Sequence, residues 1–291
     1  MLLNPCQHIV VKMIRMARLA CVPLFACFLM ISCAKLSGRS FKPGIPGYNK
    51  KHAKLFVLTK KLLEISGQVS FSDHELVAIN DEKGELVLFG LGRDDKTHYR
   101  KFGGKGDYED IVSAGSNYFV LESNGDLYRI DTGNTKEVTK YKFRLEKKVE
   151  FESLVYYEKF NKLVLITKDH GLRSDAVIGY AFDIANGEYD RRPFLTIPRH
   201  EILRKMKDYS AEFKPSSAAI HPRTGKLFIL ASIGKQLLIC SPSGTVEQAY
   251  DLNPDQFPQP EGISFASNGD MYISNEGLHG KATILKFLYE P

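Results

Sequence analysis

Short stretches in which hydrophobic and polar residues alternate recur over most of the chain. Residues 259–277 ("QPEGISFASNGDMYISNEG") show the pattern: Ile263 and Phe265 alternate with small or polar residues, and Met271 and Ile273 resume the alternation after an Asn-Gly pair. A period of two predicts half-buried β-strands, and a turn pair between two such runs predicts a hairpin. The chain is therefore rich in short antiparallel strands.

This hairpin belongs to a longer repeat that occurs five times. The copies begin at Ile65, Tyr108, Phe151, Pro215 and Pro260, at intervals of 43, 43, 64 and 45 residues. Each copy continues into a second apolar strand, a turn and a third strand. Such a period is typical of a β-propeller blade, whereas a β-sandwich does not repeat one phrase. We therefore predict an all-β, five-bladed β-propeller, with six blades as the alternative.

Two further segments complete this prediction. Residues 54–63 ("KLFVLTKKLL") precede the first repeat, and the last repeat lacks a fourth strand. We expect residues 54–63 to supply that strand and close the ring, which protects the sheet edges. The 64-residue interval contains "RHEILRKMKDYSAEF", which predicts a helical insertion near residues 199–212. Its apolar residues fall on one helical face: Ile202, Leu203, Met206 and Tyr209.

The first 32 residues predict a lipoprotein-type signal peptide. A basic segment is followed by an apolar run over residues 19–31, "LACVPLFACFLMI", which is shorter than a usual membrane span. The run ends in "MISC", which resembles a lipobox, so we expect Cys33 to carry a lipid. Residues 33–53 would then tether the domain of residues 54–291 to a bacterial membrane, on the periplasmic or surface side of the cell envelope. The alternative is a signal anchor that stays uncleaved.

Composition narrows the function classes. The net charge is +6 over 291 residues, and the basic residues form no run with interleaved aromatics, so we expect no nucleic-acid partner. Beyond Cys33 the sequence contains one cysteine, Cys240, which excludes an internal disulfide and a zinc site built on cysteine pairs. We expect a monomer whose core holds the fold together.

The candidate functional residues of the sequence occupy the second position of each repeat. Those residues are Ser66, Glu109, Glu152, Ser216 and Glu261. The first strand of a propeller blade lies against the central channel, so these side chains should form one ring that faces the axis. Carboxylates in a narrow channel must be protonated, paired or bound to a cation. An all-oxygen ligand set of variable geometry favours Ca²⁺ over Mg²⁺.

We therefore predict a calcium site near the channel, with Glu109, Glu152 and Glu261 as its first ligands. The ends of the second strands supply the other candidates: Asp81, Glu82, Asn275 and Glu276. The alternative interpretation is that these residues cap strand ends or pair with neighbouring arginines and lysines.

Several phrases of the sequence resemble one known family. "AINDEKGEL", "GDYEDI", "PSSAAIHPRTGKLFIL" and "QPEGISFASNGDMYISNEG" are similar to the SdiA-regulated family of bacterial envelope proteins, and the similarity covers roughly residues 54–291. The resemblance implies a five-bladed propeller with a bound calcium ion and an anchor in the membrane, but no defined activity. The phrase "FESL" departs from the family pattern, because Ser153 stands where a glycine is usual.

The predicted function is a membrane-anchored, extracytoplasmic propeller that binds Ca²⁺ near its channel. It would serve as a binding module for an unidentified small ligand or envelope protein. The alternative is a Ca²⁺-dependent hydrolase of an ester, lactone or phosphoester, in which the axial metal polarises the substrate. Such an enzyme needs a general base; His170, His221 and His279 lie at predicted strand ends. The sequence has no G-x-S-x-G nucleophile motif.

Overall fold

The computed structural model describes ten stretches of the chain. They are residues 41–42, 44–49, 53–72, 74–92, 97–133, 137–146, 148–169, 175–206, 212–277 and 280–291. All of them belong to one compact unit, Gly38–Pro291. The predicted signal peptide and Cys33 lie outside the described residues. Within the described stretches, no helix has the length and apolar character that a membrane crossing requires.

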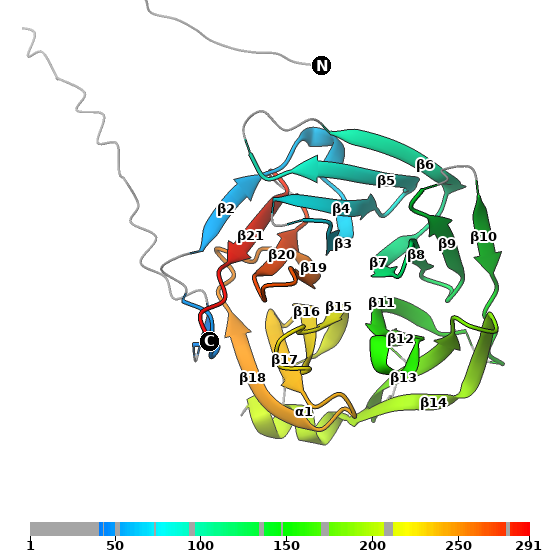
Figure 1. The fold of residues 1–291 in the computed structure, drawn as a ribbon. Coiled ribbons are helices and arrows are strands. Elements are labelled where there is room, and N and C mark those ends of the chain that lie inside the picture. The colour runs from blue at the N-terminus through cyan, green and yellow to red at the C-terminus, as the bar shows by residue number, and fades with distance from the viewer. Residues whose placement is uncertain are drawn as a thin grey trace, which may run out of the picture. The chain divides into compact units, whose positions relative to one another are not determined.

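Five antiparallel sheets surround a central axis (Figure 1). The innermost strands are β3 (Ile65–Ser70), β7 (Tyr108–Ala114), β11 (Glu150–Tyr157), β15 (Lys214–Ile220) and β19 (Pro260–Phe265). The second strands are β4 (Glu75–Asn80), β8 (Asn117–Glu122), β12 (Lys162–Asp169), β16 (Leu227–Ile233) and β20 (Met271–Asn275). The third are β5 (Lys83–Gly90), β9 (Leu127–Asp131), β13 (Ala176–Asp183), β17 (Gln236–Cys240) and β21 (Thr283–Phe287). The outer strands are β6 (His98–Lys105), β10 (Val138–Tyr141), β14 (Glu188–Pro198), β18 (Val246–Leu252) and β2 (Lys54–Val57).

This arrangement confirms the predicted five-bladed β-propeller, and a sixth blade is excluded. The long interval between the third and fourth repeats holds the extended strand β14 and the helix α1 (Arg199–Met206). Ile202 of α1 is buried, and it packs with Leu195 and Val246 in one core cluster. The insertion is therefore a helix packed on the outside of the ring; residues 207–211 of the predicted helix lie outside the described residues.

The ring is closed as predicted, by a strand from the N-terminal side of the domain. β2 pairs antiparallel with β21, with Phe56 opposite Ile284. The strand is shorter than residues 54–63, because it ends at Val57 and a 3₁₀ turn, η2 (Lys60–Leu62), follows. Leu62 of this turn is buried against Tyr272 and Ile284 in the core, so the remainder of the predicted strand packs as a turn.

Part of the segment expected to be a tether is packed on the propeller. Strand β1 (Phe41–Lys42) adds a fifth strand to one sheet by pairing with β18. Tyr48 is buried, and its hydroxyl donates to the Gly269 carbonyl at 2.7 Å. The ordered domain thus begins before residue 54. The signal that marks this is the pair Ile45 and Tyr48, two apolar residues in an otherwise basic and Gly/Pro-rich segment.

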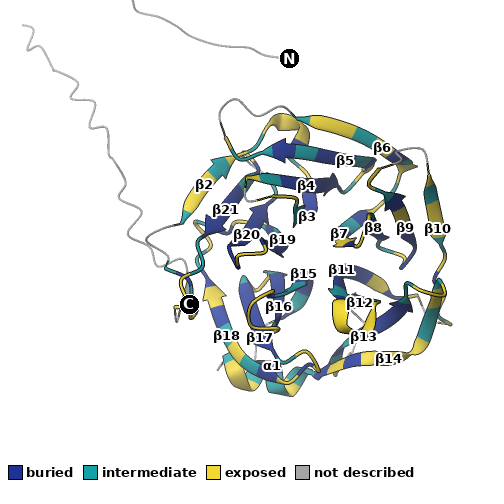
Figure 2. Ribbon diagram, viewed as in Figure 1, coloured by how far each residue is buried: buried dark blue, intermediate teal, exposed yellow. Residues whose placement is uncertain are grey.

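The core of the domain lies between neighbouring sheets. Five clusters of buried apolar side chains, found among the described residues, fill the five spaces between blades. Figure 2 shows the burial: the strands near the axis are largely buried, and the outer strands carry most of the exposed residues. Burial of apolar surface between blades is the main stabilising contribution, and it fixes the innermost strands around the channel.

Candidate functional site

All five innermost strands carry an irregularity at the equivalent place. In β7, Tyr108 pairs with Glu122 and Asp110 pairs with Leu121, so Glu109 is an extra residue in the ladder. Glu152, Ser216 and Glu261 are skipped in the same way in β11, β15 and β19, and Ser66 with Gly67 in β3. An extra residue in one strand is a β-bulge, which re-aims side chains and is frequent beside active sites.

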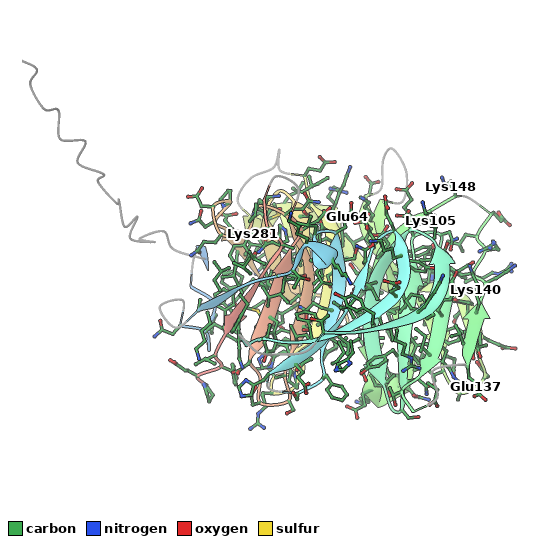
Figure 3. All side chains as sticks on the ribbon, turned by 90° about the horizontal axis from the view of Figure 1, so that it is seen from above. Glu64, Lys105, Glu137, Lys140, Lys148 and Lys281 are labelled. Atoms are coloured by element: carbon green, nitrogen blue, oxygen red, sulfur yellow. The ribbon has the colours of Figure 1, made fainter. Side chains whose placement is uncertain are left out.

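The predicted ring is therefore a ring of bulge residues. Ser66, Glu109, Glu152, Ser216 and Glu261 all lie at the start of an innermost strand, at one face of the propeller. We call this end of the channel the acidic mouth. Figure 3 shows the propeller from the side: Glu64, which precedes β3, lies at the same face as Lys105 and Lys281, whereas Glu137 lies at the opposite face.

A polar network that the sequence analysis missed crosses the axis just behind the acidic mouth. The Asp110 carboxylate accepts hydrogen bonds from the Leu154 amide at 2.9 Å and from the Ser217 hydroxyl at 3.2 Å. The Ser217 hydroxyl accepts in turn from the Ile263 amide at 3.2 Å. One carboxylate therefore links the innermost strands of four blades. Its burial raises the pKa of Asp110 to about 8, and the hydrogen bonds, which favour the carboxylate, limit the rise.

In the remaining blade, that of β3, the residue nearest to Asp110 is a glycine, Gly67. A Cβ atom at Gly67 of β3 would lie 2.3 Å from Asp110 Oδ1, far inside van der Waals contact. The position equivalent to Asp110 can therefore carry no side chain in this strand. The signal in the sequence is a pair of adjacent polar residues inside an apolar strand, Glu109–Asp110, which breaks the alternation where the bulge occurs.

The three glutamates of the acidic mouth lie close to one another; Glu152 is buried, and Glu109 and Glu261 are half-buried. Lys168, from the end of β12, forms an ion pair with Glu152, and the Ser232 hydroxyl donates to Glu261 at 3.0 Å. Burial, followed by the charge of Glu152, raises the pKa of Glu109 to about 9. Burial likewise raises the pKa of Glu261 to about 7. At neutral pH, in the absence of a cation, Glu109 therefore carries a proton.

Lys168 carries the positive charge at this mouth. Burial works against its ammonium form, but the bond to Glu152 and the nearby charges of Glu109 and Glu261 raise the pKa of Lys168 overall. One ammonium thus faces three carboxylic groups. The negative charge of Glu152 adds to the effect of burial and raises the pKa values of Glu109 and Glu261 further.

The other candidate calcium ligands lie mainly at the junction of the first and fifth blades. Burial, followed by the charge of Glu64, raises the pKa of Asp81 to about 6, and Glu276 contributes to the rise. Glu276 accepts a hydrogen bond from the Gln259 side chain. Asn275 is fully buried and donates to Thr283 Oγ1 at 3.2 Å. Glu82 is exposed. The predicted ligands therefore form two groups. One is the three glutamates of the acidic mouth, and the other is the set at the junction of the first and fifth blades.

Both groups contain oxygen atoms that are suited to a hard cation. Asp81 Oδ1 and Asn275 Oδ1 are buried and have no hydrogen-bond partner among the described residues. The oxygen-only donor set is the chemistry that Ca²⁺ requires. In the described part of the chain, however, no three His, Cys, Asp or Glu side chains converge as ligands of one ion. Calcium binding stays a prediction.

The acidic mouth opens into a pocket of about 380 Å³. Glu152, Glu261 and Ser216 line it together with three lysines: Lys168, Lys214 and Lys235. The Lys235 ammonium donates to the Ser232 carbonyl at 2.8 Å, and Lys214 pairs with Glu212 at 2.8 Å. The pocket therefore presents carboxylates near the axis and amines at its side.

Of the three predicted candidates for a general base, His221 is the one that the structure describes. His221 lies at the far end of β15 and is 1% exposed. Its Nδ1 atom accepts the backbone amides of Arg223 and Thr224 at 3.1 and 3.2 Å. His170 and His279 lie outside the described residues. Among the predicted histidines, the structure therefore places none beside Glu109.

Comparisons with known proteins support the fold. No family model matches the chain, and no curated protein matches it. Glutaminyl cyclase from Myxococcus xanthus aligns with a TM-score of 0.55 at 13% identity, covering 82% of this chain and 97% of that chain. A protein of unknown function from Bacteroides thetaiotaomicron aligns with a TM-score of 0.50 at 10% identity, covering 78% of this chain and 70% of that one. A streptogramin B lyase gives 0.49 at 9% identity, covering 81% and 97%.

At such low identity these likenesses show the fold alone. The chain is a β-propeller, and the structures that resemble it include enzymes. Since propellers carry many unrelated functions, the function must be inferred from the residues of the channel.

Proposed function

We propose that this β-propeller binds a divalent cation, Ca²⁺, at the acidic mouth, and that it is a binding module. The observation that carries the proposal is the ring of bulges, which directs Glu109, Glu152 and Glu261 into one channel mouth, where Glu152 pairs with Lys168. Burying several carboxylic groups is costly unless a charge compensates them. A cation would supply that charge.

The three glutamates would hold the ion, and the protein would exchange protons for it. Glu109, with a pKa of about 9, and Glu261, with a pKa of about 7, must lose their protons to act as ligands. Metal binding to protonated ligands releases protons, so the affinity should increase between pH 6 and pH 9. Asp81, Glu82, Asn275 and Glu276 would form a neighbouring acidic group that adds to the negative potential.

The location of the protein belongs to the same proposal. A lipid on Cys33 would anchor the propeller outside the cytoplasm, and the cation site would then face a compartment in which calcium is abundant. The resemblance to the SdiA-regulated envelope proteins agrees with this placement, and it too is part of the proposal. Replacement of Cys33 by serine should release the protein from the membrane fraction; an unchanged membrane fraction would contradict lipid anchoring.

The hydrolase remains the second reading of a cation at this mouth, but no geometric observation favours it. Such chemistry would need a general base, for which His170, His221 and His279 are candidates. His221 follows the end of β15 that lies away from the acidic mouth, and His170 and His279 lie outside the described residues. We therefore propose cation and ligand binding as the function.

Thermal unfolding of a soluble form beginning at Gly38 tests the cation proposal. After treatment with EDTA, calcium at about 100 times its Kd should stabilise the fold by about 2.7 kcal/mol through mass action, which raises Tm by about 5–10 °C. Magnesium should have a smaller effect. Glu109→Gln and Glu261→Gln should remove most of the shift, whereas Glu137→Gln, at the opposite face, should retain it. No shift, or an equal shift in all variants, would contradict the proposal.

A further inference from the structure

The end of the channel opposite the acidic mouth holds a second pocket. It has a volume of about 540 Å³, within the range of sites for small molecules. All five innermost strands contribute to it with their C-terminal ends, for example Ser70 of β3, Ser113 of β7 and Phe265 of β19. We call it the apolar mouth. Behind it, the Asp110 network crosses the axis and separates the two mouths.

The wall of the apolar mouth is aromatic and aliphatic. Tyr156, Phe160, Ile220 and Phe265 line it. Phe160 is 51% exposed at the rim. Exposed apolar side chains around a concavity are typical of ligand sites.

The floor of the pocket is polar but already satisfied. Ser264 donates to Gln68 Oε1 at 2.5 Å, and the Gln68 amide donates to the Tyr272 carbonyl at 3.2 Å. Both side chains are buried. The charged residues of the lining, Glu158 and Lys159, are exposed on the turn η3 (Glu158–Phe160) at the rim. An ion would therefore lose its hydration at the floor without a compensating charge.

We propose that the apolar mouth binds an uncharged, mainly aromatic small molecule. The ring system of this molecule stacks against Phe160, Tyr156 and Phe265. A charged ligand is disfavoured by the floor, which offers no compensating charge. This site lies at the opposite end of the channel from Glu109, so it does not depend on calcium binding.

The test is fluorescence titration with Nile red, a neutral aromatic probe that carries a carbonyl. The protein is the unit Gly38–Pro291, which contains every sheet and core cluster described above, and EDTA is present throughout. We expect saturable binding of one probe per chain with a blue shift of the emission. Ser113→Trp, at an exposed position of β7 inside the pocket, should weaken binding at least tenfold. Tyr99→Ser, an exposed aromatic residue on the outer strand β6, is the matched control and should change nothing.

Three outcomes would overturn the proposal as a whole. The first is the absence of saturable binding, and the second is Nile red binding that Ser113→Trp leaves intact. The third is a dimer, detected by sedimentation, that Phe160→Ser abolishes, since the rim would then be a contact between two copies of the chain. Failure of the calcium experiment with retained Nile red binding would leave this proposal standing.

Discussion

At the scale of single residues, the bulge position decides what each blade contributes to the channel. The same place in the repeat holds a glutamate in three blades and a serine in two. The next position is Asp110, Ser153, Ser217 or a glycine. Of these residues, Asp110 and Ser217 form the hydrogen bond of the network that crosses the axis. Ser153 is fully buried, and its hydroxyl has no hydrogen-bond partner among the described residues. The structure gives no physical reason for serine at this position.

The protonation of Glu109 makes the stability of the calcium-free protein dependent on pH. The folded protein retains the proton up to a pKa of about 9, whereas the pKa of an unperturbed glutamate is 4.5. Between these values the folded state binds more protons, so its stability decreases as the pH rises. Glu109→Gln should remove this loss. We expect the variant to gain about 2 kcal/mol over the wild type between pH 5 and pH 9, because each pKa unit is worth about 1.4 kcal/mol and coupling to Glu152 spreads the effect.

Urea unfolding in EDTA from pH 5 to pH 9 measures this difference. Glu137→Gln, which is exposed at the opposite face, is the control and should run parallel to the wild type. Parallel curves for Glu109→Gln and the wild type would show that Glu109 ionises normally.

The contact between Gly67 and Asp110 predicts the most sensitive glycine of the channel. Alanine at position 67 would bring its Cβ to 2.3 Å from Asp110 Oδ1 and 2.6 Å from Asp110 Cα. Because backbone must move, we expect Gly67→Ala to destabilise the fold by about 2–4 kcal/mol. Gly104→Ala, with no atom within 4 Å of its added Cβ, should cost less than about 1 kcal/mol. Chemical denaturation compares the two; equal costs would contradict the described packing.

At the scale of elements, the closing strand is the point at which the ring depends on a distant segment. β2 is the outer strand of the last sheet, and Phe56 packs on the cluster that contains Leu62, Tyr272 and Ile284. The neighbouring Leu55 points outward and is 57% exposed. Replacing Phe56 therefore tests how far the packing of β2 stabilises the fold, and replacing the exposed Leu55 in the same strand is the control.

Phe56→Ala should reduce the free energy of unfolding by about 2–3 kcal/mol, because it removes a large side chain that is partly buried between two blades. Leu55→Ala should change it by less than about 0.5 kcal/mol. If both variants unfold at the same urea concentration, closure by β2 contributes little to stability.

The strands and turns also show which parts of the fold can be predicted from the sequence. Five strand phrases with a common period predicted the five sheets and the closing strand, because alternation and turn residues are local signals. The end of β2 at Val57, the pairing of β1 with β18 and the packing of Tyr48 were not predicted. These depend on contacts with residues far along the chain, such as Gly269 and Leu252, which no local pattern reports.

At the scale of the whole molecule, the channel has two chemically different ends. The ring of Glu109, Glu152 and Glu261 followed from the repeat, whereas the Asp110 network and the apolar mouth did not. The apolar mouth uses the far ends of the same strands, where residues such as Phe265 and Tyr156 read in sequence as ordinary alternating core positions. Only the ring geometry shows that they converge on one pocket.

Two mouths separated by a buried network would give a module with two independent binding faces. The acidic mouth suits a cation, and the apolar mouth suits a neutral aromatic ligand. A lipid anchor on Cys33 would keep both faces outside the cytoplasm. A cation would explain why Glu109, Glu152 and Glu261 come together at one end of the channel.

A crystal structure of the protein grown with calcium, with data that record anomalous scattering, tests that claim most directly. The account predicts an anomalous peak at the acidic mouth, within ligand distance of oxygen atoms of Glu109, Glu152 and Glu261, and no such peak in crystals treated with EDTA. A mouth without a peak at millimolar calcium, with the ion pair between Lys168 and Glu152 intact, would contradict it. The three glutamates would then be compensated by protons and Lys168 alone.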